Sequence, residues 1–151
     1  MIPIRQVRLE DFEAICGHRR RMFEEAGLAS ATLERMASPF AAWLAPRLKD
    51  GRYFGFVADT DGAVVAGIGL VLLDWPPHPL HPETGERGYI LNVFVEPGYR
   101  GRGLAQELMR RAEEEFRARG VPYAVLHASA LGRPVYEQLG WDPTAEMGKA
   151  L

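Results

Sequence analysis

The chain has 151 residues, 47% of them hydrophobic, which is enough for one domain with a core of its own. Lys and Arg number 18 against 20 Asp and Glu, and a net charge of -2 gives no reason to expect a nucleic-acid partner. Cys16 is the only cysteine, so an intramolecular disulfide is excluded, and no apolar run reaches the roughly 18 residues of a membrane span. We therefore expect a single cytoplasmic domain over residues 1–151 that binds neither nucleic acid nor membrane.

Hydrophobic spacing predicts three strands and two helices in the first half of the chain. In chain order they are a strand over residues 2–7, a helix over 12–26, a second helical stretch over 30–48, and a hairpin of strands over 53–58 and 63–74. The first strand is expected at a sheet edge, because Pro3 lacks the N–H that a central strand donates. Pro39 and Pro46 are expected to break the second helical stretch. Arg19 should lay its stem along the apolar stripe of the first helix and keep its charged head in water.

The second half is predicted to begin with a proline-rich loop and to continue with alternating strands and helices. The elements are a strand over residues 88–95, a helix over 104–119, a strand over 123–127, a short helix over 131–139, and one or two further strands over 144–151. The strand-helix-strand unit implies a parallel pair. In the loop, His78 and His81 are expected to be solvated, because no cysteine or acidic cluster completes a metal site.

A glycine-rich turn joins the strand over residues 88–95 to the helix that follows, with the sequence Tyr99-Arg-Gly-Arg-Gly-Leu-Ala105. Glycines let the backbone approach a ligand, and the start of a helix supplies unpaired N–H groups and positive dipole charge. This combination suits a pyrophosphate. A Walker A loop is excluded, because Leu104 and Ala105 stand where Lys and Ser or Thr are needed. A dinucleotide fingerprint is excluded, because Gln106 occupies the third glycine place.

This turn closely resembles the acyl-CoA-binding motif Gln/Arg-x-x-Gly-x-Gly/Ala of the GCN5-related N-acetyltransferases, the GNAT family. Gly101 and Gly103 fill the glycine places, and Gly98 replaces the leading Gln or Arg. The segment over residues 129–141, Ser-Ala-Leu-Gly-Arg-Pro-Val-Tyr-Glu-Gln-Leu-Gly-Trp, resembles the later family motif Asn-x-x-Ala-x-x-x-Tyr-Glu-x-x-Gly-Phe. Tyr136 stands at the tyrosine of that motif and Ser129 at its asparagine. The two motifs occur in the family's order.

The resemblance covers nearly all 151 residues and implies an α/β (α+β) fold. Its sheet is mixed and largely antiparallel, with six or seven strands, about four flanking helices and a central parallel pair that splays apart. The resemblance also implies acetyl-CoA as cosubstrate and no metal. The acceptor is a small molecule or peptide, and its primary amine attacks acetyl-CoA directly. A homodimer is common in the family. The alternative is a non-catalytic acyl-CoA-binding or regulatory domain on the same fold.

The resemblance also assigns site residues. The amide of Val93 faces the acetyl oxygen, and Tyr136 is the general acid that protonates the leaving sulfur. The remaining contacts to acetyl-CoA come from the strand, the glycine turn and the later motif, namely Phe94, Val95, Arg100, Gly101, Arg102, Gly103, Leu104, Ala105 and Ser129. The general base is left open between Glu86, Asn92, Glu96, His127 and a chain of waters. The acceptor is expected between the N-terminal helices and the proline-rich loop, where side chains can shape a pocket or simply pack: Trp43, Trp75, His78 and His81.

Overall fold

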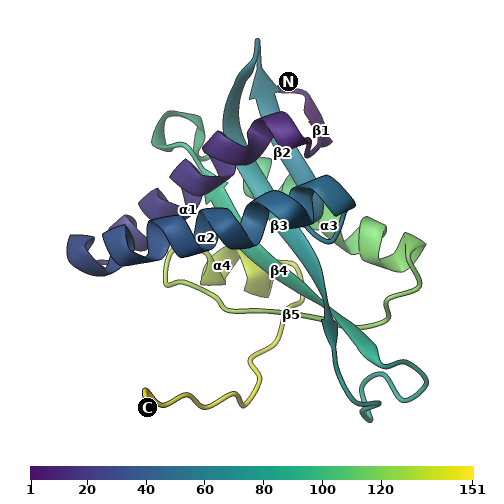
Figure 1. Ribbon diagram of the computed structural model, residues 1–151. Coiled ribbons are helices and arrows are strands. Elements are labelled where there is room, and N and C mark those ends of the chain that lie inside the picture. Colours follow the sequence, from purple (N-terminus) through teal and green to yellow (C-terminus); the bar gives the residue numbers. More distant parts are fainter.

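Five strands form one sheet in the order β1-β2-β3-β4-β5, in a computed structural model that describes all residues 1–151 (Figure 1). The strands are β1 (Ile4–Gln6), β2 (Phe54–Thr60), β3 (Ala63–Asp74), β4 (Glu86–Val95) and β5 (Ala124–Leu126). The helices are α1 (Phe12–Glu25), α2 (Ser30–Asp50), α3 (Leu104–Ala118) and α4 (Arg133–Gln138), with short 3-10 turns at η1 (Leu9–Asp11) and η2 (Pro97–Tyr99). In Figure 1, α1 and α2 lie in front of the sheet and α3 lies behind it.

The sheet is mixed and largely antiparallel, as predicted. β1 to β4 pair antiparallel with their neighbours, whereas β4 and β5 run parallel. The parallel pairing is short, since it begins at Gly88 with Ala124 and ends at Ile90 with Leu126. β4 continues to Val95 without a strand on that side. The sheet therefore has an open edge along the second half of its fourth strand.

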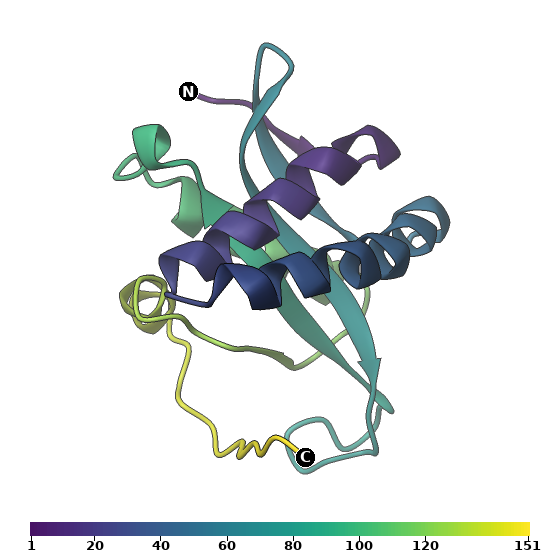
Figure 2. The same cartoon turned by 60° about the vertical axis from the view of Figure 1, so that its left-hand side comes forward.

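The prediction of six or seven strands was wrong, because the sheet has five. The expected strands over residues 144–151 do not form, and the tail after α4 runs apart from the sheet (Figure 2). Its sequence explains this, because Pro143 and Gly148 interrupt it and the alternation of Ala145, Glu146 and Met147 is too short for a strand.

The predicted break in the second helical stretch was also wrong. α2 is continuous over 21 residues and contains both Pro39 and Pro46. Each proline removes one helical hydrogen bond. Leu33, Phe40 and Leu44 are buried along the same helix, and this packing holds it together where local propensity alone would break it.

Apolar residues fill both faces of the sheet. On one face, α3 buries Leu108, Met109 and Ala112 completely, and on the other Leu44 of α2 has no exposed surface. α3 lies close to the sheet because Gly88 has no side chain: a Cβ there would come within 2.6 Å of the Phe116 ring. The helix predicted over residues 104–119 is thus confirmed as α3, and its position fixes the glycine turn that precedes it. None of the helices combines the length and apolar character that crossing a bilayer requires.

Candidate active site

β4 contains a β-bulge in its second half. The register with β3 shifts between Gly67 and Gly69, so that Asn92 and Val93 together lie opposite Ile68. Asn92 has a φ of 56°, in the left-handed region that asparagine tolerates better than most other residues. The bulge therefore adds one residue to β4 at a position where the sequence supplies a residue able to adopt the conformation.

The bulge changes which backbone amides of β4 face the open edge. Before it, the N–H of Gly88 donates to a carbonyl just before β5 at 2.9 Å; after it, the N–H of Glu96 donates to Val65 of β3 at 2.9 Å. Because amide directions alternate along a strand, the amides of Val93 and Val95 point away from β3. β4 has no strand partner there, so both amides lie on the open edge.

The turn after β4 presents unpaired N–H groups at the start of α3. Gly101 and Gly103 have φ values of 74° and 78°, a region that glycine enters without strain, and Gly103 is the N-cap of the helix. None of the backbone N–H groups of residues 101–106 donates a hydrogen bond within the protein. With the positive end of the helix dipole, these groups form a surface that favours an anion.

The two arginines of the turn bind the protein itself. Arg100 donates to the carbonyl of Val95 at 2.8 Å and to the carboxylate of Glu25, at the end of α1, at 2.6 Å. Arg102 donates to the carbonyl of Gly98 at 3.0 Å and has no acidic partner. Arg100 thus fixes the turn against α1 with its charge balanced, whereas the charge of Arg102 is not balanced by a carboxylate.

Tyr136 lies on α4 and packs into the core on the α3 side, with 8% of its surface exposed. Burial raises the pKa of its hydroxyl, which makes no hydrogen bond within the protein. The ring lies so close to Gly132 that a Cβ there would come within 2.9 Å of it. Ser129 accepts a hydrogen bond from the N–H of Gly132 at 3.1 Å, so its side chain fixes the entry to α4 and still has its own proton to donate.

Three of the four side chains considered as general base are engaged or distant. Glu86 opens β4, and six residues of strand, about 20 Å, separate it from the bulge. Glu96 lies 2.6 Å from Arg21 and 3.4 Å from the His18 ring. Asn92 is buried and uses its amide to bind other side chains. None of the three offers a free proton acceptor at the open edge.

His127, the fourth candidate, directly follows β5. Its Nδ1 lies 2.5 Å from the hydroxyl of Tyr89, and its Nε2 contacts the carboxylate of Glu146 in the tail. Burial raises the pKa of Tyr89, and the charge of Glu146 acts in the same direction. Tyr89 packs with residues of α1 and α2. A Tyr–His–Glu chain therefore lies on the face of the sheet that α1 and α2 cover, a grouping that the sequence did not reveal.

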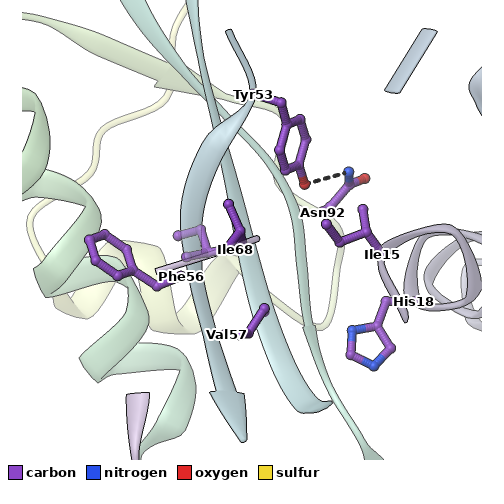
Figure 3. Close-up of a pocket in the computed structure, with 9 residues that line it drawn as sticks. Ile15, His18, Tyr53, Phe56, Val57, Ile68 and Asn92 are labelled. Atoms are coloured by element: carbon purple, nitrogen blue, oxygen red, sulfur yellow. Dashed lines mark hydrogen bonds between the residues drawn. The ribbon is translucent and has the colours of Figure 1, made fainter. Parts of the chain in front are cut away.

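Asn92 joins three elements through its side chain. Its Nδ2 donates to the hydroxyl of Tyr53 at 3.1 Å, as Figure 3 shows, and its Oδ1 accepts from Nη1 of Arg19 at 2.7 Å. The expectation that the head of Arg19 lies in water was therefore wrong: the guanidinium turns inward to the bulge. Burial raises the pKa of Tyr53 from its usual 10 to about 12.

The cavity in Figure 3 lies between α1 and the sheet, beside Asn92, with Ile15, His18 and Ile68 among its lining residues. Its volume is about 10 Å³, which is room for one water molecule at most. An acceptor amine needs more space, so this cavity is not the substrate site.

The proline-rich loop is held by a buried histidine. The prediction that His81 is solvated was wrong, since it is 1% exposed and accepts a hydrogen bond from Nε of Arg87 at 3.2 Å. Arg87 in turn lies over the rings of Trp75 (4.2 Å) and Tyr123 (5.0 Å). No group of three or more metal-ligating side chains occurs in the chain. These aromatic residues pack the loop, and Trp43 lies apart from them against Phe40.

Known acetyltransferases share this fold. The model of the acetyltransferase (GNAT) family matches residues 12–141, and the chain belongs to this family. A GCN5-related N-acetyltransferase from Ralstonia eutropha JMP134 is 51% identical, with a TM-score of 0.98 over 100% of this chain and 99% of that chain. A protein described as a predicted acetyltransferase from Clostridium acetobutylicum, solved with acetyl-CoA, is 26% identical, with a TM-score of 0.90 over 100% and 96% of the two chains.

Two curated relatives match over shorter stretches. Mycothiol acetyltransferase from Beutenbergia cavernae is 39% identical over 90 residues, which are 58% of this chain and 27% of that protein. Glucosamine 6-phosphate N-acetyltransferase from Trypanosoma brucei brucei is 39% identical over 54 residues, 36% of this chain and 37% of that protein. The chain therefore spans well under half the length of these relatives, and their names do not identify its acceptor.

The raised pKa of Tyr53 predicts a loss of stability in alkaline solution. The neutral phenol is favoured in the folded state, so its contribution is complete below pH 10 and is lost as pH rises towards about 12. The loss amounts to roughly 2–3 kcal/mol. Urea unfolding between pH 8 and pH 11.5 measures it. Tyr53→Phe should start from a lower stability but show a shallower decline; equal slopes for the two proteins would contradict the assignment.

Proposed function

We propose that the protein is an N-acetyltransferase that transfers the acetyl group of acetyl-CoA to a primary amine by direct attack. The observation that carries the proposal is the adjacency of two unpaired backbone surfaces. One is the open edge of β4 with the amides of Val93 and Val95, and the other is the row of N–H groups over residues 101–106. Family membership and the relative solved with acetyl-CoA support the same donor.

The residues at this place fit acetyl-CoA. Its pantetheine arm is an extended chain with two amides, and such a chain can pair with an open strand edge as an added strand does. We infer that β4 and β5 diverge after Ile90 and that the arm lies between them. The pyrophosphate would then meet the N–H groups of residues 101–106, the unbalanced charge of Arg102, and the backbone of Leu104 and Ala105.

The other residues assigned to acetyl-CoA have supporting roles in this proposal. Arg100 acts through the turn that it fixes, because its charge is already balanced by Glu25. Phe94 is buried and its ring lies 5.6 Å below the guanidinium of Arg100, so it supports the turn. Ser129 has a hydroxyl proton to donate towards the pantetheine.

Acetyl-CoA supplies the activated acyl carbon: the acceptor nitrogen forms the new C–N bond, the C–S bond breaks, and CoA leaves as a thiol. The amide of Val93 donates to the carbonyl oxygen as negative charge develops on it. Tyr136 gives its proton to the leaving sulfur, and burial keeps the hydroxyl protonated at neutral pH. His127 receives the proton that the amine loses, directly or through Tyr89, and Glu146 balances the imidazolium.

The glycine turn is tested by a pair of substitutions to alanine. Gly103→Ala places a Cβ at a φ of 78°, which strains the turn and shifts its N–H groups, so acetyl-CoA should bind roughly 10-fold more weakly by isothermal titration. Gly98→Ala is the matched control, because Gly98 lies in open space without a left-handed φ, and its affinity should change less than about twofold. Absence of acetyl-CoA binding to the unmodified protein at millimolar ligand would disprove the donor assignment.

Tyr136→Phe tests the general acid. Release of CoA thiol with a panel of amines should fall by about 100-fold or more, while acetyl-CoA affinity stays within about threefold. Tyr123→Phe, the same change at a partly buried tyrosine outside the proposed site, should leave both quantities unchanged. If the unmodified protein binds acetyl-CoA but releases no thiol with any amine, the non-catalytic acyl-CoA-binding function is favoured instead.

His127→Gln tests the proton acceptor. With an alkylamine, which is protonated in neutral solution, turnover should fall by roughly 100-fold. With an arylamine or hydrazine, which is already neutral, the loss should be no more than a few-fold, because no proton has to be removed before attack. His78→Gln in the proline-rich loop is the matched control and should have no effect. An equal loss with both kinds of amine would show that His127 has a structural role only.

A further inference from the structure

Arg19 is a largely buried cation that no carboxylate neutralises. Its only hydrogen bond goes from Nη1 to the neutral amide of Asn92 at 2.7 Å. Nε is fully buried and has no partner, and Nη2 also has none but keeps contact with solvent. Burial lowers the pKa of the guanidinium, and the only titratable side chains that act against this are the phenols of Tyr53 and Tyr89, which are neutral at physiological pH.

The other arginines of α1 are paired in the ordinary way. Arg20 binds Glu24 at 2.9 Å and Glu34 at 3.4 Å, and Arg21 binds Glu96 at 2.6 Å. Arg19 instead lies over the rings of Phe23 and Phe40, at 4.9 and 4.6 Å. A buried cation without a counter-charge destabilises a fold, and a carboxylate partner would have relieved that cost. The helix therefore pairs its exposed arginines and leaves the inward one uncompensated.

Only one of the two unpaired nitrogens of the guanidinium reaches solvent, namely Nη2, because Nε is fully buried. Nε and Nη2 form one edge of the group, the edge that a carboxylate or phosphate binds with two parallel hydrogen bonds. The opposite nitrogen, Nη1, is the one that Asn92 holds. Asn92 is the bulge residue next to Val93, and Tyr89 lies on the same face of the sheet. The guanidinium of Arg19 thus lies beside the place proposed for amine attack.

We propose that Arg19 binds an anionic group of the acceptor, so that the substrates are amines that carry a carboxylate or a phosphate. This inference rests on the proposed N-acetyltransferase function and names the acceptor class of the same site. The anion bonds to Nη2, and the guanidinium then has the counter-charge that the protein itself does not supply. Polyamines and other purely cationic amines are disfavoured by the same charge.

Matched pairs of amines test the proposal. Each of several L-amino acids is compared with its amide, and glucosamine 6-phosphate with glucosamine, by the kcat/KM of thiol release. We expect the anionic member of the preferred pair to react roughly 10- to 100-fold better, with the difference mainly in KM. The amino group of an amino-acid amide is the less basic one, so any bias from amine protonation acts against this result. The amino-acid pairs test for a carboxylate and the glucosamine pair tests for a phosphate, so the two kinds of anion are distinguished.

Two variants leave Arg19 without an uncompensated charge. Arg19→Gln deletes the guanidinium. Asn92→Asp keeps it but balances its charge with a carboxylate beside Nη1, in the place of the present amide. Both should reduce the preference for the anionic member to within about threefold. Arg20→Gln on the same helix is the control, and it should keep the full preference. Calorimetric binding of the N-acetylated form of each pair gives a second readout that needs no turnover, and acetyl-CoA affinity reports whether each variant is folded.

The outcomes separate this inference from the function on which it rests. Equal use of the anionic and neutral members by the unmodified protein, or a preference that survives Asn92→Asp, overturns the role of Arg19 even if Arg19→Gln does not fold. Failure of every anionic N-acetylated probe to bind overturns it as well. Failure to bind acetyl-CoA overturns the proposed transferase itself, whatever the acceptor pairs show.

Discussion

One extra residue in β4 is the constraint on which the rest of the site depends. The bulge at Asn92 turns the amides of Val93 and Val95 to the open edge, and without it they would be used by β3. The same residue ties the start of β2 and the middle of α1 to the bulge through Tyr53 and Arg19. A strained backbone position is thus held from two sides by hydrogen bonds, and the proposed donor and acceptor places meet at this point.

The glycine turn depends on packing on both of its sides. α3 can approach the sheet because Gly88 lies beneath Phe116, and this approach sets the place of its unpaired N–H groups. On the other side, Arg100 connects the turn to Glu25 at the end of α1. The glycine turn is therefore held on both sides, and its N–H groups are in position before any anion binds.

Local patterns in the sequence predicted most of the fold and located the segments from which the candidate site is built. The glycine turn, the helix after it and the Tyr136 motif depend on neighbours within a few residues, so spacing was sufficient. Arg19 and Asn92 are 73 residues apart, and Tyr53 and Asn92 are 39 apart, so only the folded chain brings them together. Tertiary packing also keeps α2 continuous at Pro39 and Pro46, which local propensity could not predict. The one local signal for Arg19 was a charged residue in an apolar stripe, which is equally typical of a side chain whose head reaches water.

The failure of the tail to form strands leaves a sheet whose two outermost strands, β1 and β5, are also its shortest, with three residues each. Unpaired strand edges are where separate chains join and aggregate, and natural proteins limit this risk by keeping such strands short. Pro3, just before β1, removes one more donor from that side. The protein therefore leaves the edge of β4 open, where we propose that acetyl-CoA binds, while offering other copies of itself little backbone to pair with.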